Sequence, residues 1–297
     1  MNAGNRDARI AGWSRPSSDD EVIQQERAVR MVKAAIAAST SLADASLRVY
    51  AKGSYANNTN VRRDSDVDIV VQLTECEYFD YYGDQPDVHN PSPYEGPWTK
   101  DSWRRAVTRA MVAAFDDVDT SGKIAVKIPA VAGSRPPIDV VPAFDYRLFW
   151  NPRRTDWSAG SCVWSSVGKQ IVNWPDQQLD NGRAKNDRTR KRYKNTARVL
   201  KNAKNHLAAA GTIKDLPSYL MECLAWNVPD PVLWSGSTPA YDFQETLRWL
   251  WLHLGDDYRH DDWDEPNQLK YLFGAHQKWT VADAQGLVRA TWNLMEY

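Results

Sequence analysis

The segment Asp66–Leu73, DVDIVVQL, constrains this chain most, because it places two carboxylates at the start of a strongly apolar run. Alternate side chains of a β-strand share a face, so Asp66 and Asp68 point one way while the apolar residues between them point into a core. Two like charges this close repel each other unless a cation neutralises them, and a divalent metal with oxygen ligands does so. Asp64 has the same parity, so the pair can also be placed one step earlier. We favour Asp66 and Asp68 because the apolar run surrounds them.

Two further segments carry groups that suit a phosphate and a metal. A predicted strand, Leu47–Lys52, ends at Gly53 and Ser54. There the glycine permits close approach of the backbone, and the serine offers a hydroxyl and an N–H. A later predicted strand, Ile138–Phe144, holds Asp139 within an apolar run. A buried carboxylate is costly unless it is paired or ligated, so Asp139 either binds a metal or forms a salt bridge with a buried arginine.

The order of predicted elements divides the chain into a mixed α/β half and an all-α half. Residues 1–17 are polar and are expected to be irregular, and residues 77–100 are expected to form a long loop. The α/β half carries predicted helices at about 18–39 and 103–111, and predicted strands at 47–52, 66–73, 123–129 and 138–144. Past about residue 165, strand patterns stop and helical stripes follow at about 187–210, 217–227, 242–254 and 280–295.

Composition excludes several classes of protein. The chain is 42% hydrophobic and 25% charged, and its net charge of −1 argues against a protein that coats nucleic acid through bulk charge. Its three cysteines are too widely spaced for a disulfide framework, which fits a reducing, cytoplasmic compartment. No apolar run of about 18 residues occurs, so no membrane span is expected, and the N-terminus lacks the apolar segment of a secretory signal.

Combined, these motifs form a known pattern: Gly53 and Ser54, eleven further residues, the Asp66/Asp68 pair and a distant single Asp139. The pattern resembles the nucleotidyltransferase superfamily of DNA polymerase β. The wider context, with GSYANNTN, IDVVPAF, RVLKNAKN and LPSYLMECLAWNVP, resembles the bacterial cyclic-oligonucleotide synthases (CD-NTases) related to cyclic GMP-AMP synthase and dinucleotide cyclase. The tryptophan-rich tail and the ECLAWNVP segment are most similar to the E clade, which has pyrimidine-using members.

The resemblance implies an α+β fold in two lobes. Residues 1–165, with an N-terminal helix, would form a polymerase β-like nucleotidyltransferase core around a mixed sheet. Residues 166–297 would form a C-terminal helical lobe that completes the nucleotide cleft. The implied activity is synthesis of a cyclic di- or oligonucleotide second messenger from NTPs, and the product would activate a separate effector in anti-phage signalling.

The resemblance also assigns chemistry to the three acids and the turn. Asp66, Asp68 and Asp139 would hold two Mg²⁺ ions, for which Mn²⁺ can substitute. A ribose hydroxyl would attack the α-phosphate of an NTP and pyrophosphate would leave, with Asp139 assisting deprotonation of the hydroxyl. Gly53 and Ser54 match the turn that contacts the triphosphate.

Four residues of the second half match the family as well. Lys201 matches a triphosphate-binding lysine, Ser218 a serine that touches the triphosphate at a helix start, and Tyr219 a tyrosine that stacks on a nucleobase. Asn173 lies where the pyrimidine-using clade carries a base-reading asparagine, although a plain loop position before a proline turn explains it equally well. Lys201 belongs to a basic stretch, residues 183–204, and for most of its other cations a solvated helix face explains the pattern as well as a binding role does.

UTP and a purine NTP are the expected substrates. The sequence has no Cys/His cluster of the kind that binds zinc in the animal DNA sensor, so no activation by DNA is expected. Two other functions stay open: a nucleotidyltransferase that modifies RNA or protein, of the tRNA-end or oligoadenylate type, and a catalytically dead fold that serves as a binding module. The near-neutral charge weighs against a long RNA substrate, and the intact set of acids against a dead module.

Overall fold

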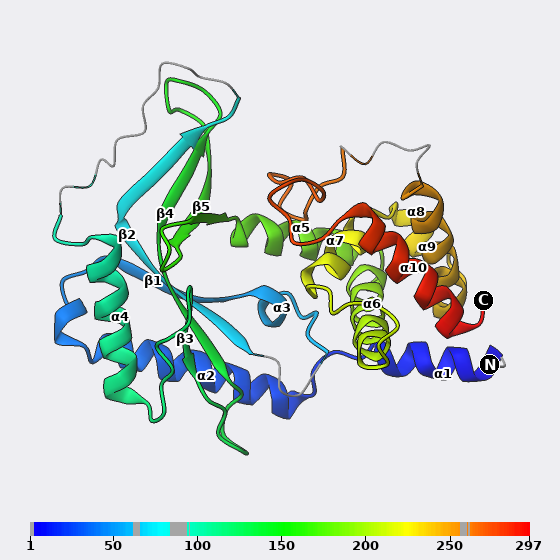
Figure 1. Ribbon diagram of the computed structural model, residues 1–297, viewed down its shortest axis with the longest axis horizontal. Helices are drawn as coiled ribbons and strands as arrows, with labels where there is room; N and C mark the ends of the chain where they lie inside the picture. The colour runs from blue at the N-terminus through cyan, green and yellow to red at the C-terminus, as the bar shows by residue number, and fades with distance from the viewer. Residues whose placement is uncertain (1–2, 62–65, 84–93, 95, 256–259, 261) are drawn as a thin grey trace. The chain divides into compact units, whose positions relative to one another are not determined.

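The chain folds into two compact units that interleave along the sequence (Figure 1). The structure, a computed structural model, describes residues 3–61, 66–83, 94, 96–255, 260 and 262–297. The sheet unit comprises Ser18–Tyr55 and Arg62–Asp176, and the helical unit comprises Met1–Ser17, Ala56–Val61 and Gln177–Tyr297. Two segments of the N-terminal half therefore pack with the C-terminal helices, which the sequence did not indicate.

A six-stranded mixed sheet forms the centre of the sheet unit. The resemblance implies a mixed sheet, and four of its strands were predicted, whereas β5 and β6 were not. Strands neighbour one another in the order β1-β2-β4-β5-β6, and β3 pairs with β4. Strands β2 and β4 are parallel, and the other described pairs are antiparallel. The strands are β1 (Leu47–Lys52), β2 (Val67–Tyr81), β3 (Val126–Ile128), β4 (Ile138–Phe149), β5 (Trp157–Trp164) and β6 (Gln170–Asn173).

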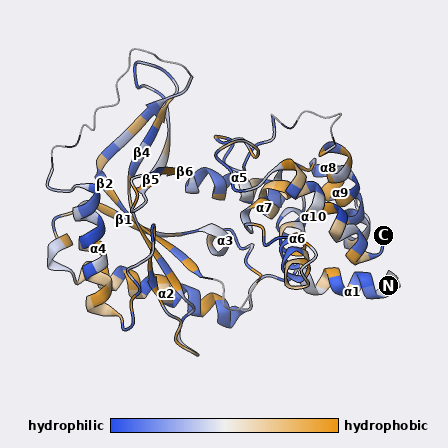
Figure 2. Ribbon diagram, in the orientation of Figure 1, coloured by the Kyte–Doolittle hydropathy of each residue, from blue (hydrophilic) through white to orange (hydrophobic). Residues whose placement is uncertain are grey.

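Helices α2 (Asp19–Ala37) and α4 (Lys100–Ala114) pack against each other and against the sheet. Helix α2 begins where the sequence predicts, because Ser18 accepts the N–H of Glu21 while the Glu21 side chain accepts the N–H of Ser18. A small apolar cluster that includes Val70 lies on the sheet face to which Asp68 also belongs by alternation. Figure 2 shows that hydrophobic residues recur along the strands of this unit.

Two strands are longer than predicted. The segment 77–81, expected to be loop, continues β2, and β4 runs on to Phe149 beside it past an irregularity between Leu73 and Glu77. Aromatic packing stabilises this extension, since the rings of Phe79 and Phe149 lie 5.7 Å apart at 69°. The rest of the predicted loop lies largely outside the described residues. Strand β6 also forms after residue 165, where no strand was expected.

The remaining helices are α1 (Ala3–Trp13), α3 (Gly53–Ala56), α5 (Pro175–Arg188), α6 (Arg192–Ala209), α7 (Tyr219–Asn227), α8 (Asp230–Leu233), α9 (Pro239–His253) and α10 (Val281–Met295). The predicted stripes correspond to α6, α7, α9 and α10, whose leucines fill the core of the helical unit. Helices α1 and α5 were missed because each is mostly polar; Ile10 is the buried apolar residue of α1, and α5 buries Lys185. None of the described helices combines the length and the apolar character that a membrane span requires.

Candidate active site

One row of residues across four strands carries two acids flanked by two lysines. The strand register pairs Lys52 of β1 with Asp68 of β2, Asp68 with Asp139 of β4, and Asp139 with Lys127 of β3. Residues paired directly across strands project from the same face, so the charges follow in the order cation, anion, anion, cation. Asp66 lies just before β2 and is exposed, whereas Asp68 and Asp139 are half-buried.

The two acids of this row are held in an environment that disfavours their charge. Burial raises the pKa of Asp68; Lys52 opposes this effect, and the nearby charges of Asp139 and Asp66 add to it. Burial also raises the pKa of Asp139; Lys127 and Lys52 oppose this, and Asp66 adds to it. Burial lowers the pKa of Lys52 in turn, and both acids oppose that shift. The two lysines compensate only part of the negative charge of Asp66, Asp68 and Asp139. The remaining negative charge can attract a further cation.

The turn after β1 is packed directly onto one of these acids. Gly53 adopts a φ of +72°, and a Cβ built on it would lie 2.5 Å from Oδ2 of Asp68. Glycine alone satisfies both conditions, because it tolerates positive φ and has no side chain to meet the carboxylate. Ser54, half-buried, follows in the short helix α3. The sequence pattern of Gly-Ser and Asp-x-Asp therefore describes one place in the fold.

The donor set of this place suits magnesium. Carboxylate oxygens are the ligands that magnesium prefers, and the ion commonly takes one or two of them together with waters and substrate phosphates. Among the described residues, no three His, Cys, Asp or Glu side chains converge as a formed metal site. Asp66 and Asp139 are near enough to Asp68 for their charges to raise its pKa, although the three carboxylates do not converge on one point.

Lys201 lies in the helical unit and is used internally. Only 1% of it is exposed, and its ammonium forms an ion pair with Glu222. The same nitrogen donates to the carbonyl and the hydroxyl oxygens of Thr59, each at 3.0 Å. The three ammonium hydrogens therefore have three acceptors within the protein, and the structure does not present Lys201 to an open surface.

The other three predicted residues lie in different surroundings. Ser218 is exposed at the start of α7, and its hydroxyl does not cap that helix. Tyr219 donates to Oε2 of Glu265 at 3.2 Å, and burial raises its pKa well above the usual value. Asn173 is the last residue of β6, half-buried and paired in register with Ser161, so it lies in a strand rather than in a loop.

The basic stretch is a solvated face only in part, since Arg183, Arg188, Arg190 and Lys191 are exposed but other cations of the stretch are buried. Lys185, Arg198 and Lys204 are each no more than 5% exposed. Their partners are Asp230 for Lys185, backbone carbonyls for Arg198 and Asp215 for Lys204. The interpretation as a solvated face is wrong for these residues because their partners come from distant segments, which the local sequence cannot reveal.

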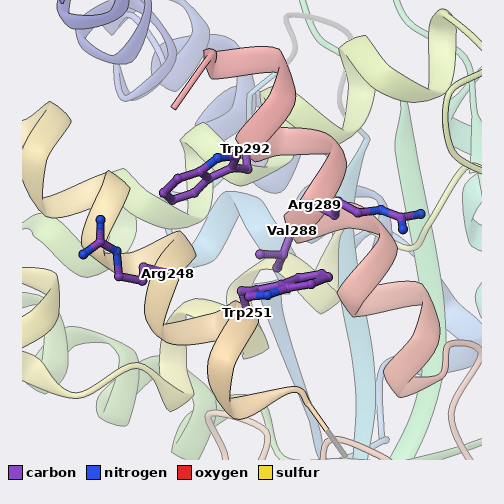
Figure 3. A pocket seen from close by; sticks show the side chains of 5 residues that line it. All are labelled: Arg248, Trp251, Val288, Arg289 and Trp292. Carbon is purple, nitrogen blue, oxygen red and sulfur yellow. The ribbon is translucent and has the colours of Figure 1, made fainter.

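One pocket formed by described residues lies in the helical unit, away from this row in the sequence. It measures about 420 Å³ and is lined by Arg248, Trp251, Val288, Arg289 and Trp292 of α9 and α10 (Figure 3). None of these side chains is a carboxylate, so the pocket has no ligand for a hard cation. The acids that the sequence predicts as metal ligands lie elsewhere, in the row of the sheet and just before β2.

Sequence reasoning missed Lys52 and Lys127 as members of the site. Lys52 directly precedes Gly53, and its parity on β1 was readable, but the register that sets it beside Asp68 was not. Lys127 joins the row only through the pairing of β3 with β4.

Comparisons with known proteins find relatives that match nearly the whole chain. A family model, the C-terminal helical domain of cGAS/DncV-like nucleotidyltransferases, matches residues 180–296. A cyclic dipyrimidine nucleotide synthase CdnE from Legionella pneumophila is 35% identical over 289 residues, 96% of each chain. A cyclic dipurine nucleotide synthase from Elizabethkingia meningoseptica is 30% identical, covering 97% of this chain and 98% of the relative. The solved structure of a Rhodothermus marinus CdnE c-UMP-AMP synthase with Apcpp and Upnpp has a TM-score of 0.82 at 28% identity, covering 98% of this chain and 96% of that one.

Proposed function

This chain belongs to the E clade of the bacterial CD-NTases, and on that premise we propose that Asp66, Asp68 and Asp139 are the metal-binding acids of its reaction. As a member of this family it is a nucleotidyltransferase that synthesises cyclic nucleotides from NTPs, with a nucleotidyltransferase fold followed by a helical domain. The observation that carries the proposal is the register of Asp68 with Asp139, next to the Gly53 turn.

The proposed chemistry joins a ribose hydroxyl to an α-phosphate. The hydroxyl oxygen attacks the α-phosphorus of an NTP, the bond to the bridging oxygen of pyrophosphate breaks, and Asp139 accepts the hydroxyl proton. Asp139 suits this role because burial raises its pKa. Magnesium, or manganese in its place, when bound by the three acids, supplies charge stabilisation to the attacking and leaving oxygens. A second transfer of the same kind closes the ring.

The turn and the helical unit contribute nucleotide-binding groups in this proposal. The backbone at Gly53 and the hydroxyl of Ser54 hold phosphate oxygens. Ser218, exposed at the start of α7, also contacts the triphosphate, and Tyr219 offers its ring to a base. Lys201, buried in an ion pair with Glu222, is not among these groups.

UTP and a purine NTP are the proposed substrates, with Asn173 reading the uracil edge. The relatives differ in their bases, since their names include a dipyrimidine, a dipurine and a UMP-AMP synthase. The product is proposed to act on a separate effector protein in anti-phage signalling, without activation of the synthase by DNA.

Product analysis tests the proposal. Purified protein is incubated with labelled NTPs and Mg²⁺, and the products are treated with phosphatase. A phosphatase-resistant cyclic product supports the proposal. A linear oligonucleotide, or label transferred to added RNA or protein, identifies the RNA- or protein-modifying alternative. Absence of any transfer identifies a binding module.

A further inference from the structure

A buried polar network anchors the loop that follows the Gly53 turn. The loop, residues 57–60, lies within the helical unit, although the turn before it belongs to the sheet unit. Asn58 is exposed, but the other three side chains of the loop and their partners are polar and almost fully buried: Asn57 5% exposed, Thr59 1%, Asn60 5%, Arg198 4%, Lys201 1% and Glu222 3%. Buried polar groups of this kind are retained where each finds a partner, and they then fix one conformation.

Thr59 is the centre of this network. Its hydroxyl donates to Oε1 of Glu222 at 2.5 Å, and both of its oxygens accept from the Lys201 ammonium. Lys201 of α6 and Glu222 of α7 also pair with each other. Gln178 of α5 lies 3.5 Å from the second oxygen of Glu222 (elements in Figure 1). One threonine is thus held by residues of two helices, and the carboxylate of the pair contacts a third.

The residues on either side of Thr59 are held as well. Arg198 donates to the carbonyl of Asn58 at 2.5 Å and to the carbonyl of Ser14 at 2.7 Å. The amide of Asn60 donates to Oγ of Ser17 at 2.5 Å. Three consecutive loop residues therefore have contacts to the helical unit that leave the chain little freedom.

These contacts also show why Lys201 is badly placed to bind a phosphate. To reach one, its ammonium would have to leave three acceptors and a site that is 1% exposed. Glu222, itself 3% exposed, would then be a buried carboxylate without its cation, which is a strongly unfavourable state.

We propose that Lys201 and Glu222 are positioning residues that hold Thr59 and thereby fix the Gly53-Ser54 turn six residues upstream. The inference deepens the proposed function, because it rests on that turn as the phosphate-binding element. Helices α6 and α7 act on the reaction through the backbone of residues 53–59 rather than through a lysine–phosphate contact.

Thr59→Val tests this directly, because it removes the hydroxyl, keeps the side-chain volume and leaves both charges paired. Thr59→Ser restores the hydroxyl and is the matched rescue. Thr59→Val lowers kcat/KM about tenfold, as expected for a lost hydrogen bond to a charged pair, and Thr59→Ser stays within about twofold of wild type. Hydrogen exchange of a peptide covering residues 53–61 is faster in Thr59→Val than in wild type, and in Thr59→Ser it has the wild-type rate.

Glu222→Gln separates positioning from direct binding. If Lys201 bound the triphosphate, this change would release its ammonium from a competing carboxylate, so affinity for a non-hydrolysable NTP analogue would stay or increase. In the positioning account, Glu222→Gln and Lys201→Met both raise exchange at 53–61 and lower kcat/KM together. Lys185→Met is the control, since Lys185 is also 5% exposed and held by a carbonyl and a carboxylate, but not by the loop.

Each outcome decides the inference. It is overturned if Thr59→Val and Glu222→Gln keep wild-type exchange at 53–61, or if Lys201→Met alone loses affinity for the analogue. If Thr59→Val does not fold, Glu222→Gln and its exchange pattern carry the same test. Exchange does not depend on turnover, so a wild type that makes no nucleotide product refutes the proposed function while the exchange result still judges the role of Lys201.

Discussion

The backbone of Gly53 lies against the carboxylate of Asp68, so close that an added Cβ would be 2.5 Å from Oδ2. The turn and the acid come from different strands, β1 and β2, and the pairing of Lys52 with Asp68 brings them together. A phosphate held by the backbone of this turn would therefore lie beside the carboxylate that we propose as a metal ligand. This contact is the structural basis for taking the two motifs as one site.

Gly53→Ala should damage both stability and activity. A side chain at positive φ costs roughly 1 kcal/mol, and here the methyl also has to displace Asp68. Gly133→Ala is the matched control, because Gly133 has nearly the same φ, +71°, and a methyl group added to it would meet nothing within 4 Å. Thermal unfolding and kcat for both variants check this. Equal activity of the two variants would contradict the contact's importance.

Asp68→Asn should stabilise the metal-free protein at neutral pH. Burial raises the pKa of Asp68 above 3.8, so its folded form favours the proton. Its stabilising contribution is present below the unfolded pKa and is lost as pH rises through the folded pKa. In EDTA at pH 7 the variant should gain roughly 2–4 °C in Tm, about 1 kcal/mol, and the gain should shrink near pH 4.

The control for this measurement is Glu77→Gln on the same strand, whose carboxylate pairs with Arg147 at 2.9 Å. It exchanges a carboxylate for an amide outside the row, so its Tm at pH 7 should not increase. An Asp68→Asn gain of the same size at pH 4 and pH 7 would show that charge is not the cause.

Lys52→Met should increase the stabilisation that a divalent metal gives. In EDTA the substitution has two opposing effects on Tm: it removes a charge that burial disfavours, and it leaves the repulsion between Asp68 and Asp139 less compensated. It also removes a cation that repels a divalent ion, so Mn²⁺ should raise Tm more than in wild type. Lys123→Met, at an exposed position, is the control. A Mn²⁺ response identical to wild type would exclude Lys52 from the site.

Asn173→Ser should weaken UTP use relative to purine NTPs. An amide that pairs with a uracil edge leaves an unmet polar group when another base enters, at about 1–3 kcal/mol or roughly ten- to a hundredfold in selectivity. Product analysis from the four NTPs, singly and in pairs, measures this for both proteins. If wild type makes only purine products, UTP is not a substrate, but the cyclase activity is not contradicted. Unchanged selectivity in the variant would remove only the role of Asn173.

Local patterns predicted the parts of the fold whose cause is local. The alternation in 66–73 predicted β2, and the Ser18 cap with its acidic first turn predicted the start of α2. The same parity argument predicted that Asp66 and Asp68 belong together. Helix α1 was not predicted, because it is stabilised by packing onto α6 and α9, and its polar sequence does not reveal these tertiary contacts.

The features that could not be predicted depend on contacts between residues far apart in the sequence. Lys201 and Glu222 contact Thr59 across 142 and 163 residues of sequence. The family resemblance implies a lysine that faces the triphosphate, whereas the fold buries Lys201 in an ion pair with Glu222. The row from Lys52 to Lys127 depends on strand order, in which β4 lies between β2 and β3. The surroundings of Lys201 and of the row from Lys52 to Lys127 depend on strand register and burial, which residue type alone does not indicate.

The most direct test of the account is the reaction of the Asp66→Asn/Asp68→Asn double variant with labelled NTPs, in Mg²⁺ and in Mn²⁺, beside wild type and Glu77→Gln. The account predicts phosphatase-resistant cyclic product from wild type and Glu77→Gln. It predicts none from the double variant at any metal concentration, with a folded protein by circular dichroism. Turnover near the wild-type rate in the folded double variant would contradict the assignment of these acids.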